Sequence, residues 1–394
     1  MRDAVIVSTA RSPIGKAFRG ALNNIKSPTL AAHAIAHAVQ RAGIEGTEVE
    51  DVVIGSCLTA GTAGQNLARN AALAAGLGVG ASGQTIDRQC ASGLMAIATA
   101  AKQVLFDGMD IVVAGGQENI SALNASYNEW VAREKDEQVM RFAEHAYMPM
   151  LHTAEFVAKK YGISREVQDQ YALLSQQRTA AGQAAGRFDA EIVPITATMA
   201  VVDKATRQTS YKEVTLARDE GNRADTTLES LAGLKPVVEG GVITAGNASQ
   251  LSDGASACVI MDSALASRRG LQPLGIYRGM SVAGCAPEEM GIAPIYAIPK
   301  LLKQHGLKIG DIGLWEINEA FAVQVLYVRD HLGIDPAIYN VDGGGISIGH
   351  PYGMTGARVV GHALIEGRRR GVKYVVAGMC IGGGMGAAAL FEIA

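Results

Sequence analysis

The sequence predicts an α/β protein with a mostly parallel sheet that is covered by helices on both faces. Short apolar segments alternate with helical stretches from residue 4 to residue 114, and again from residue 314 to residue 377. This alternation is typical of parallel strands joined by crossover helices. The composition agrees, because 48% hydrophobic residues with 47 glycines describe a tightly packed globular enzyme rather than a disordered chain.

The first region of alternation begins with an apolar strand at residues 4–7 and a helix over 29–42. We expect Ser27 to be the N-cap of that helix, Pro28 to be its first residue and Gly43 to end it. The same reasoning predicts five further elements: a strand at 52–54, a helix over 66–75, a strand around 85–86, a helix over 92–106 and a strand at 111–114.

The pattern changes between about residue 121 and residue 242. Charged residues concentrate in 129–141, helical patterning dominates 153–186, and no strong strand alternation persists. We interpret this region as an inserted domain of helices and loops. Alternation then returns with a strand at 314–317, a helix after Asn318, a strand at 339–341, a helix over 355–366 and a strand at 374–377.

The second region of alternation repeats the first. Val-Val-Ala-Gly-Gly at 112–116 has a counterpart in Val-Val-Ala-Gly-Met at 375–379, and internal duplication is the simplest explanation. The predicted division is residues 1–120 with 245–270 as one half, 121–244 as the insertion and 271–394 as the other half. A pseudo-symmetric pair of halves would bring Cys90 and His350 together at the centre as structural counterparts.

Size, charge and cysteine usage exclude several classes of protein. A chain of 394 residues predicts two or three domains, and a net charge of -3 argues against a nucleic-acid-binding protein. Five cysteines without Cys-x-x-Cys spacing fit neither a disulfide framework nor a structural zinc site. The apolar run follows Met1 to Asp3 directly, and no stretch is long enough to span a membrane, so we expect a cytoplasmic protein.

Cys90 is the candidate nucleophile. It follows a strand-like segment and precedes Ala91, Ser92, Gly93 and a helix that carries no charge until Lys102. Its sulfur is therefore expected at a helix N-terminus, where backbone N–H groups favour the thiolate. Most isolated cysteines are buried and inert, and we accept that interpretation for Cys57, Cys258 and Cys285.

Three further motifs offer partners for this thiol. His350 lies in a turn that Pro351 stiffens and that glycines precede at 343–345, so it is a candidate base. Cys380 is expected in a glycine-rich loop at the end of a strand, where backbone N–H groups, including that of Gly382, can line an oxyanion. Asn318 lies at a strand-to-helix junction, where a plain N-cap is the alternative. The glycine runs fit neither a Walker loop nor a dinucleotide fingerprint.

Together these segments resemble the thiolase family. The resemblance is carried by Cys90 in Cys-Ala-Ser-Gly, Asn318 in Asn-Glu-Ala-Phe, His350 in Gly-His-Pro-x-Gly and Cys380 in Cys-Ile-Gly-Gly-Gly, in that order along the chain. It extends from Val5 to Glu392. It implies a five-layered αβαβα fold built from two duplicated halves with an inserted helical and loop domain, assembled as a dimer or a tetramer.

The resemblance also implies a reaction, with roles in fatty acid metabolism and β-oxidation. Acyl groups would exchange between acyl-CoA or acetyl-CoA and 3-ketoacyl-CoA through an acyl-Cys90 intermediate, with His350 as the base and Cys380 as acid/base. His350 with a water held by Asn318 would form one oxyanion hole, and the N–H groups of Cys90 and Gly382 the other. Coenzyme A would be a substrate and product, with no tightly bound cofactor and no metal.

The resemblance further places Ser249 and Ala248 beside the pantetheine arm of CoA, and Arg223 and Ser230 near its nucleotide. The chain departs from the family pattern in three places. Asp342 stands where many relatives have Asn, and Gln250 replaces a glycine. Pro149-Met150-Leu151-His152 precedes Thr153, where acetoacetyl-type relatives commonly have His-Met-Gly. The last change predicts a different pocket wall near the acyl chain.

Three alternatives remain. A β-ketoacyl synthase shares the fold and a cysteine nucleophile, but it pairs that cysteine with two histidines and lacks the loop of Cys380. A non-catalytic thiolase-like protein would bind acyl chains or CoA after losing catalytic residues, whereas all four are present here. A Cys-His hydrolase is disfavoured because the motif set favours CoA over water as the acyl acceptor.

Overall fold

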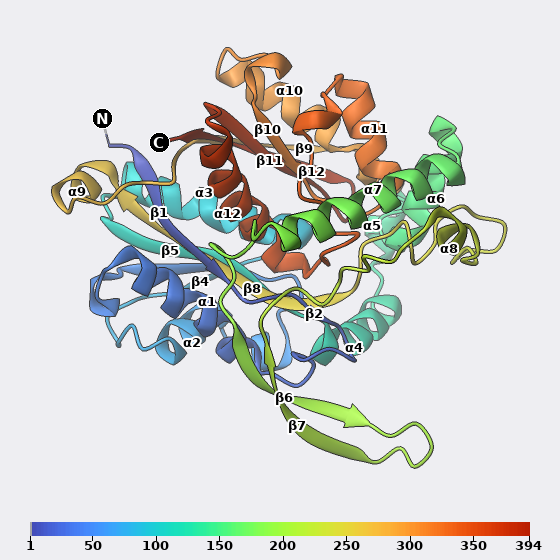
Figure 1. The fold of residues 1–394 in the computed structure, drawn as a ribbon, viewed down its shortest axis with the longest axis horizontal. Coiled ribbons are helices and arrows are strands. Elements are labelled where there is room, and N and C mark those ends of the chain that lie inside the picture. Colours follow the sequence, from blue (N-terminus) through green and yellow to red (C-terminus); the bar gives the residue numbers. More distant parts are fainter. Residues whose placement is uncertain (1) are drawn as a thin grey trace.

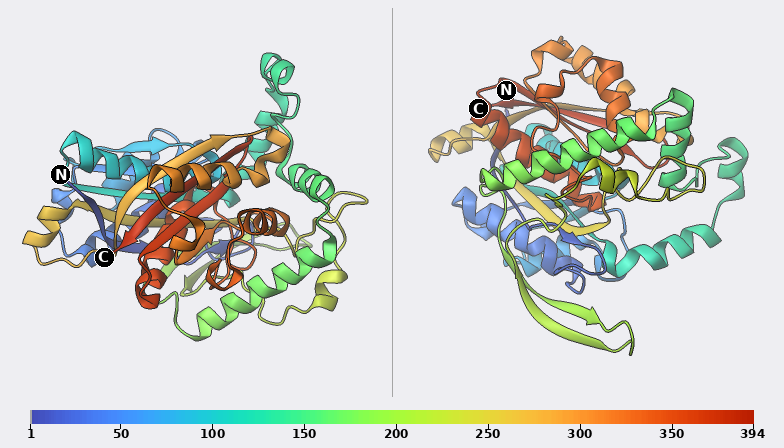
Figure 2. Two further views of the ribbon diagram at one scale, coloured as in Figure 1. Left: turned by 90° about the horizontal axis from the view of Figure 1, so that it is seen from above. Right: turned by 45° about the vertical axis from the view of Figure 1, so that its right-hand side comes forward.

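The computed structural model describes residues 2–394 and shows five layers (Figure 1). Helices α1 and α2 cover one outer face, α3 and α12 lie in the centre, and α10 and α11 cover the opposite outer face, with strands between them. The two termini lie close together at one end (Figure 2). The helices of the layers are α1 (Ser27–Ala42), α2 (Leu67–Ala74), α3 (Ser92–Lys102), α10 (Pro294–Gln304), α11 (Ala322–Leu332) and α12 (Tyr352–Arg370), and α9 (Ser263–Arg268) lies at the edge.

The strands on the two sides of the central helices form one continuous mixed sheet. Its strand order is β10-β11-β12-β9-β1-β8-β5-β3-β4, and β2 pairs with β8. The two halves join where β1 pairs with β9 over only Val5 and Ile6. The strands are β1 (Ala4–Arg11), β2 (Gly15–Lys16), β3 (Asp51–Gly55), β4 (Gln84–Ile86), β5 (Ile111–Asn119), β8 (Ser252–Asp262), β9 (Gly275–Gly284), β10 (Leu314–Ile317), β11 (Tyr374–Ile381) and β12 (Met385–Ile393).

The strand pairings repeat between the two halves. In the first, β3 is parallel to both β4 and β5, whereas β8 is antiparallel to β5 and β1. In the second, β10 is parallel to β11, whereas β12 is antiparallel to β11 and β9. A parallel bridge from Trp315 to Tyr339 takes the place of the β3–β4 pairing. The duplication predicted from the repeated Val-Val-Ala-Gly segments is therefore visible in the topology.

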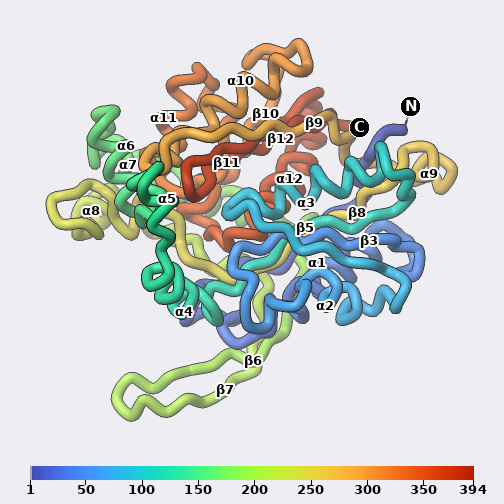
Figure 3. Tube along the Cα trace, turned by 180° about the vertical axis from the view of Figure 1, so that it is seen from behind, coloured from blue at the N-terminus to red at the C-terminus, as the bar shows by residue number. Residues whose placement is uncertain are grey.

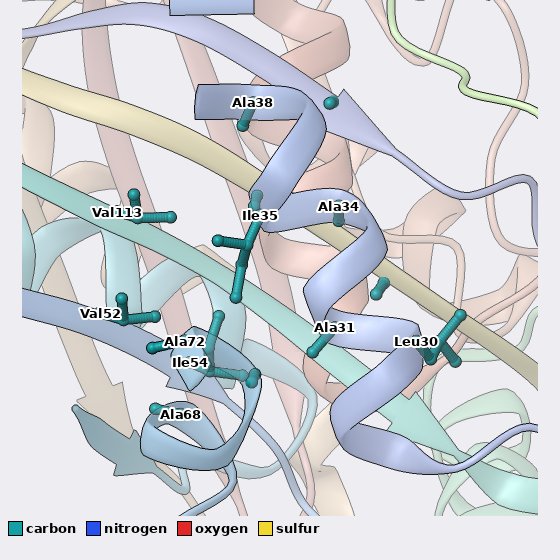
Figure 4. Close-up of a cluster of buried hydrophobic side chains, with 14 of the residues drawn as sticks. Leu30, Ala31, Ala34, Ile35, Ala38, Val52, Ile54, Ala68, Ala72 and Val113 are labelled. Atoms are coloured by element: carbon teal, nitrogen blue, oxygen red, sulfur yellow. The ribbon is translucent and has the colours of Figure 1, made fainter. Parts of the chain in front are cut away.

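The hydrophobic core of the first half explains why small residues dominate its helices. Leu30, Ala34 and Ile35 on α1 pack onto Val52 and Val113 of the sheet (Figure 4). Alanine at the contact positions lets a helix lie close to a sheet, so that burial of many small side chains replaces burial of a few large ones. The central helix α3 is likewise rich in buried alanines, which allows α12 to pack closely against it.

The insertion contains helices and a protruding hairpin. The strands β6 and β7 form an antiparallel ribbon that extends away from the body (Figures 1 and 3), and Val202 and Tyr211 on this ribbon are exposed. No helix within residues 2–394 combines the length and apolarity needed to cross a bilayer. The elements of the insertion are α4 (Ile120–Arg133), α5 (Glu137–Phe142), α6 (Met150–Tyr161), α7 (Arg165–Ala184), β6 (Ile195–Val202), β7 (Thr209–Leu216) and α8 (Leu228–Ala232).

Several expectations about the elements were wrong. The sheet is mixed rather than mostly parallel, because β8, β9 and β12 are antiparallel to their neighbours. The polar start of β8, Ser252 to Ser256, resembles a loop in sequence, yet every residue of this strand is buried. The insertion does contain strands, β6 and β7, whose alternation is weak because most of their side chains are exposed. Ser27 is the first residue of α1, Lys26 is its N-cap, and the Ser27 hydroxyl accepts from Thr62 instead.

The expected strand at 339–341 is reduced to one bridge at Tyr339. The reason is Asn340, whose φ of 47° turns the backbone out of the sheet. Its carboxamide takes over the pairing, since Oδ1 accepts from Ile317 N at 2.8 Å and Nδ2 donates to Ile317 O at 2.8 Å. A side chain therefore continues the ladder where the backbone leaves it.

Candidate active site

Cys90 lies in a tight turn, Gln89–Ala91, that leads directly into α3. Gln89, directly before the cysteine, adopts a φ of 48°, an unusual conformation for a residue other than glycine. The backbone N–H groups of Gly382 and of Cys90 itself lower the pKa of the Cys90 thiol, which indicates that they lie near its sulfur. The turn therefore places the thiol at a helix N-terminus, between the two halves of the molecule.

The electrostatics of Cys90 differ from the sequence-based expectation. Burial raises the pKa of the thiol to about 11, and the two N–H groups offset only part of that effect. Glu118 and Asp87 raise the pKa further. The resting group is therefore a thiol, and the helix N-terminus by itself does not generate the thiolate. A base must remove the proton.

His350 is held in one defined orientation. Its Nδ1 lies 2.6 Å from the hydroxyl of Thr355, and that hydroxyl donates its single proton to the carbonyl of Pro351 at 2.9 Å. The hydroxyl can therefore only accept from the ring, so Nδ1 carries the proton and Nε2 has the lone pair. Burial, with Arg358 as a smaller contribution, lowers the pKa of His350 to about 3, so the neutral ring can accept a proton at Nε2.

Asn318 follows β10 directly and is fully buried. Its Nδ2 lies 3.3 Å from Nε2 of His350. The N-cap alternative is wrong, because the N-cap of α11 is Phe321. Glycine permits this approach, since a Cβ at Gly345 would lie 3.1 Å from the Asn318 side-chain oxygen and 2.7 Å from the carbonyl of Glu319.

Cys380 is the penultimate residue of β11, and the glycine-rich turn starts only after Ile381. The expectation that Cys380 itself lies in the loop was wrong, because the strand pairs with β12 as far as Ile381. Burial raises the pKa of Cys380 well above its ordinary value, and Cys90 is the next contribution, which places the two sulfurs in one environment. Gly382 follows in the turn, where a Cβ would lie 3.5 Å from the Met150 sulfur.

The structure brings the predicted pantetheine contacts to the same region. Ser249 donates its N–H to the carbonyl of Ala320 at 2.9 Å, and Ala248 forms an antiparallel bridge with Phe321. These two residues therefore lie against the segment that follows Asn318. Gln250, one of the departures from the family pattern, accepts from the N–H of His350 at 3.0 Å, and its Nε2 donates to the carbonyls of Gly221 and Ile346. Gln250 thus ties the insertion to the loop of the histidine.

Arg223 and Ser230 lie on exposed parts of the insertion. The Ser230 side chain is already used within α8, because it donates to the carbonyl of Thr227 at 2.8 Å and accepts from its N–H at 3.0 Å. The α8 helix packs on the loop of Ala248, since a Cβ at Gly246 would lie 2.6 Å from Leu231 and Leu234. A separate cleft of about 550 Å³ is lined by residues of both charges, among them Lys16, Arg218 and Glu220, and by none of the candidate catalytic residues.

Several residues that shape this site were not identified from the sequence. Thr355 orients His350, and its only signal was its position five residues after the histidine. Cys57, which we interpreted as inert, donates its thiol to Gln89 Oε1 at 3.1 Å, directly beside the nucleophile. Glu118 is a fully buried carboxylate at the end of β5. Asp342, one of the departures from the family pattern, lies 3.3 Å from His362 and so belongs to a buried charge network.

Comparison with known proteins agrees with this geometry. The thiolase N-terminal domain matches residues 4–264, and the thiolase C-terminal domain matches residues 271–393. Two similar proteins, 3-ketoacyl-CoA thiolase of Bacillus subtilis and acetyl-CoA acetyltransferase of Cupriavidus necator, are each 42% identical over 100% of both chains. The crystal structure of Bacillus anthracis acetyl-CoA acetyltransferase matches with a TM-score of 0.88 and 41% identity, covering 100% of this chain and 99% of the other.

The chain therefore belongs to the thiolase family. Its fold is the thiolase fold, and its activity is that of a thiolase acyltransferase, a family that uses CoA substrates. The family resemblance inferred from four motifs is confirmed.

Proposed function

We propose that the protein cleaves and forms 3-ketoacyl-CoA through an acyl-enzyme on Cys90. In the cleaving direction, His350 takes the thiol proton at Nε2 and the sulfur attacks the 3-keto carbon. The bond between C2 and C3 then breaks, the acyl group stays on Cys90, and C2 leaves as acetyl-CoA after Cys380 gives it a proton. The proton held by His350 then passes to the Cys380 thiolate, which restores both groups. A CoA thiol next attacks the acyl-Cys90 thioester and gives its proton to Nε2 of His350, which returns that proton to the Cys90 sulfur as acyl-CoA departs.

Two oxyanion holes follow from the donors around Cys90. The N–H groups of Cys90 and Gly382, which lower the pKa of the Cys90 thiol, form one of them. Once His350 has taken the thiol proton, its Nε2–H and a water held by Asn318 form the other, and the 3.3 Å separation of Asn318 Nδ2 from His350 Nε2 supports this assignment. In the condensing direction the same groups act in reverse, and Cys380 removes a proton from the methyl group of acetyl-CoA.

A single observation carries the proposal: the His350 ring keeps its proton on Nδ1, against Thr355, and its lone pair on Nε2, which lies beside Asn318. The pKa values of about 3 for His350 and about 11 for Cys90 keep both resting groups neutral, so the proton moves to Nε2 as the sulfur attacks the substrate. This favours the catalytic assignment over a non-catalytic protein that binds acyl chains or CoA, because mere binding does not require an oriented base.

The substrates that we propose are 3-ketoacyl-CoA thioesters, acetoacetyl-CoA included, with CoA as the acyl acceptor and no tightly bound cofactor or metal. The names of the two relatives at 42% identity cover both the acyl and the acetyl reaction. Ser249 and Ala248 are proposed to contact pantetheine, and Arg223 with Ser230 the nucleotide. Within residues 2–394 all five cysteines are free thiols, which favours the cytoplasm, and we propose a homodimer or homotetramer that serves fatty acid metabolism, including β-oxidation.

The test is CoA-dependent thiolysis of acetoacetyl-CoA beside a longer 3-ketoacyl-CoA, with loss of the 3-ketoacyl thioester as the readout. Any acyl adduct is identified by peptide mass. Cleavage with an adduct on the peptide of Cys90 supports the proposal and ranks the two chain lengths. Tight CoA binding without turnover of either substrate would instead support the non-catalytic alternative.

A further inference from the structure

Glu118 is a carboxylate in an unusual place. It is the penultimate residue of β5, a strand in which every residue is buried, and its own exposure is 0%. Burying a carboxylate is costly unless hydrogen bonds compensate for the lost hydration. The groups that surround Glu118 must therefore explain how the protein keeps this carboxylate buried.

Four donors surround the carboxylate, and they come from two separate segments. The first segment follows β3: Cys57 N donates to Oε2 at 2.9 Å, and Leu58 N and Ser56 Oγ donate to Oε1 at 3.0 and 3.2 Å. The second is the start of α12, where Gly353 N donates to Oε2 at 2.9 Å. One side chain thus ties a loop of the first half to a helix of the second.

Each tied segment continues into the candidate active site. Gly353 lies three residues after His350, and it is wedged against the first half, because a Cβ there would lie 2.6 Å from the carbonyls of Gln117 and Gly55. On the other side, the Cys57 thiol donates to Gln89 Oε1 at 3.1 Å, and Gln89 directly precedes Cys90. A continuous chain of contacts therefore runs from the base, through Glu118, to the nucleophile.

The charge of Glu118 works against its neighbour. Glu118 raises the pKa of the Cys90 thiol, so as a charge it disfavours the thiolate that catalysis needs. Its four partners are donors that are matched by geometry, and none of them is a cation. What offsets the unfavourable effect on the Cys90 thiolate must be the way in which the carboxylate fixes the two segments that donate to it.

We propose that Glu118 is a positioning residue that fixes the loop of His350 against the turn of Cys90. The inference rests on the roles proposed above for these two residues. Glu118 does not touch substrate; it acts by holding both segments at the junction of the two halves. A displacement of about 1 Å between reacting groups costs roughly 100-fold in rate. Holding the base at a fixed distance from the nucleophile therefore offsets the cost of burying the carboxylate.

The experiment is the Glu118→Gln variant of the full-length protein, in which the amide turns a donor toward the backbone N–H groups and at least one contact is lost. Burial raises the pKa of Glu118 to about 7, so the test is run at about pH 8.5, where this carboxylate is charged. The readout is the rate at which iodoacetamide alkylates Cys90, resolved from the other cysteines by peptide mass. A role through charge predicts faster alkylation, because removing the negative charge lowers the pKa of the thiol. Positioning predicts slower alkylation, by roughly 10- to 100-fold, because the base is displaced.

Asp253→Asn is the matched control. Asp253 is also fully buried, lies on the neighbouring strand β8, and accepts from Ser121 rather than from the loops of the site. We expect this variant to alkylate at close to the wild-type rate, with thermal unfolding checked in parallel. Equal slowing in both variants would assign the effect to general destabilisation and overturn the proposal, as would unchanged or faster alkylation in Glu118→Gln.

If Glu118→Gln does not fold, Ser56→Ala removes one of the four donors and carries the same test, with slower alkylation expected and unchanged or faster alkylation contradicting the proposal. Turnover adds a second readout, in which kcat falls while KM stays near the wild-type value. The alkylation readout needs no turnover. A wild-type protein that forms no acyl-Cys90 would therefore refute the proposed function, while the comparison of the variants still decides the role of Glu118.

Discussion

Nε2 of His350 lies 3.3 Å from Nδ2 of Asn318, although the two residues are on different loops and no regular element joins them. The contact exists because Gly345 lets the loop of the histidine approach the end of β10, where a side chain would collide with Glu319. The geometry of the base is therefore set by a glycine as much as by the histidine itself.

Cys90→Ser is expected to abolish covalent acylation, because the serine hydroxyl is a far weaker nucleophile without the same activation. Mass spectrometry of the protein after incubation with acetyl-CoA measures the adduct. An acyl group retained at full occupancy elsewhere on the chain would remove Cys90 from the proposed role.

Cys380→Ala is expected to keep some acyl-enzyme formation while losing carbon–carbon bond cleavage and formation. The reason is that proton transfer at C2 needs Cys380, whereas simple thioester exchange needs only Cys90 and His350. The two rates are measured separately, as adduct formation from acetyl-CoA and as thiolysis of acetoacetyl-CoA. Equal loss of both activities would contradict a separate role for Cys380.

Thr355→Val is expected to lower kcat by roughly 10- to 100-fold, because the ring loses the acceptor that keeps the proton on Nδ1. Thr355→Ser keeps the hydroxyl and serves as the control, with activity near that of the wild type. The measurement is steady-state thiolysis at saturating substrate. A valine variant as active as the serine variant would show that the tautomer does not depend on this hydroxyl.

Gly345→Ala is expected to destabilise the fold by about 1–3 kcal/mol, because the new Cβ would lie 2.7 Å from the carbonyl of Glu319. Chemical denaturation measures the change in the free energy of unfolding. Gly310→Ala is the control, since nothing lies within 4 Å of a Cβ at that position. The same loss of stability in both variants would rule out the close approach as the cause.

Asp342→Asn is expected to cost about 1–3 kcal/mol near neutral pH, because His362 loses a charged partner at 3.3 Å. Burial alone would lower the pKa of His362, but Glu191 and Asp342 raise it to about 10. Since the folded pKa exceeds the ordinary value of 6.5, this stabilisation is complete below about pH 6.5 and is lost as the pH rises through about 10.

The difference in thermal stability between wild type and Asp342→Asn should therefore shrink between about pH 6.5 and about pH 10, where His362 loses its proton. Thermal unfolding across that range measures it. A difference that stays constant with pH would show that Asp342 acts without the charge of His362.

Motifs with strong local signals were predictable from the sequence alone. Cys90 before a helix of small residues, His350 in a turn framed by glycine and proline, and the repeated Val-Val-Ala-Gly segments identified the family and the duplicated halves. These features depend on residues close together in the chain, where steric and hydrogen-bonding preferences act directly. The parallel strands beside the crossover helices were found for the same reason.

Tertiary structure alone decided the features that depend on partners far apart in sequence. The antiparallel strand β8 is polar at its start and becomes a buried strand only because β1 and β5 flank it. The pKa of Cys90 was misjudged because the influence of the helix N-terminus is local and visible in the sequence. Desolvation arises only where the second half of the molecule packs against the turn of Cys90. Glu118, Thr355 and Asp342 acquire their roles in the same way, since their partners meet only when the two halves pack together.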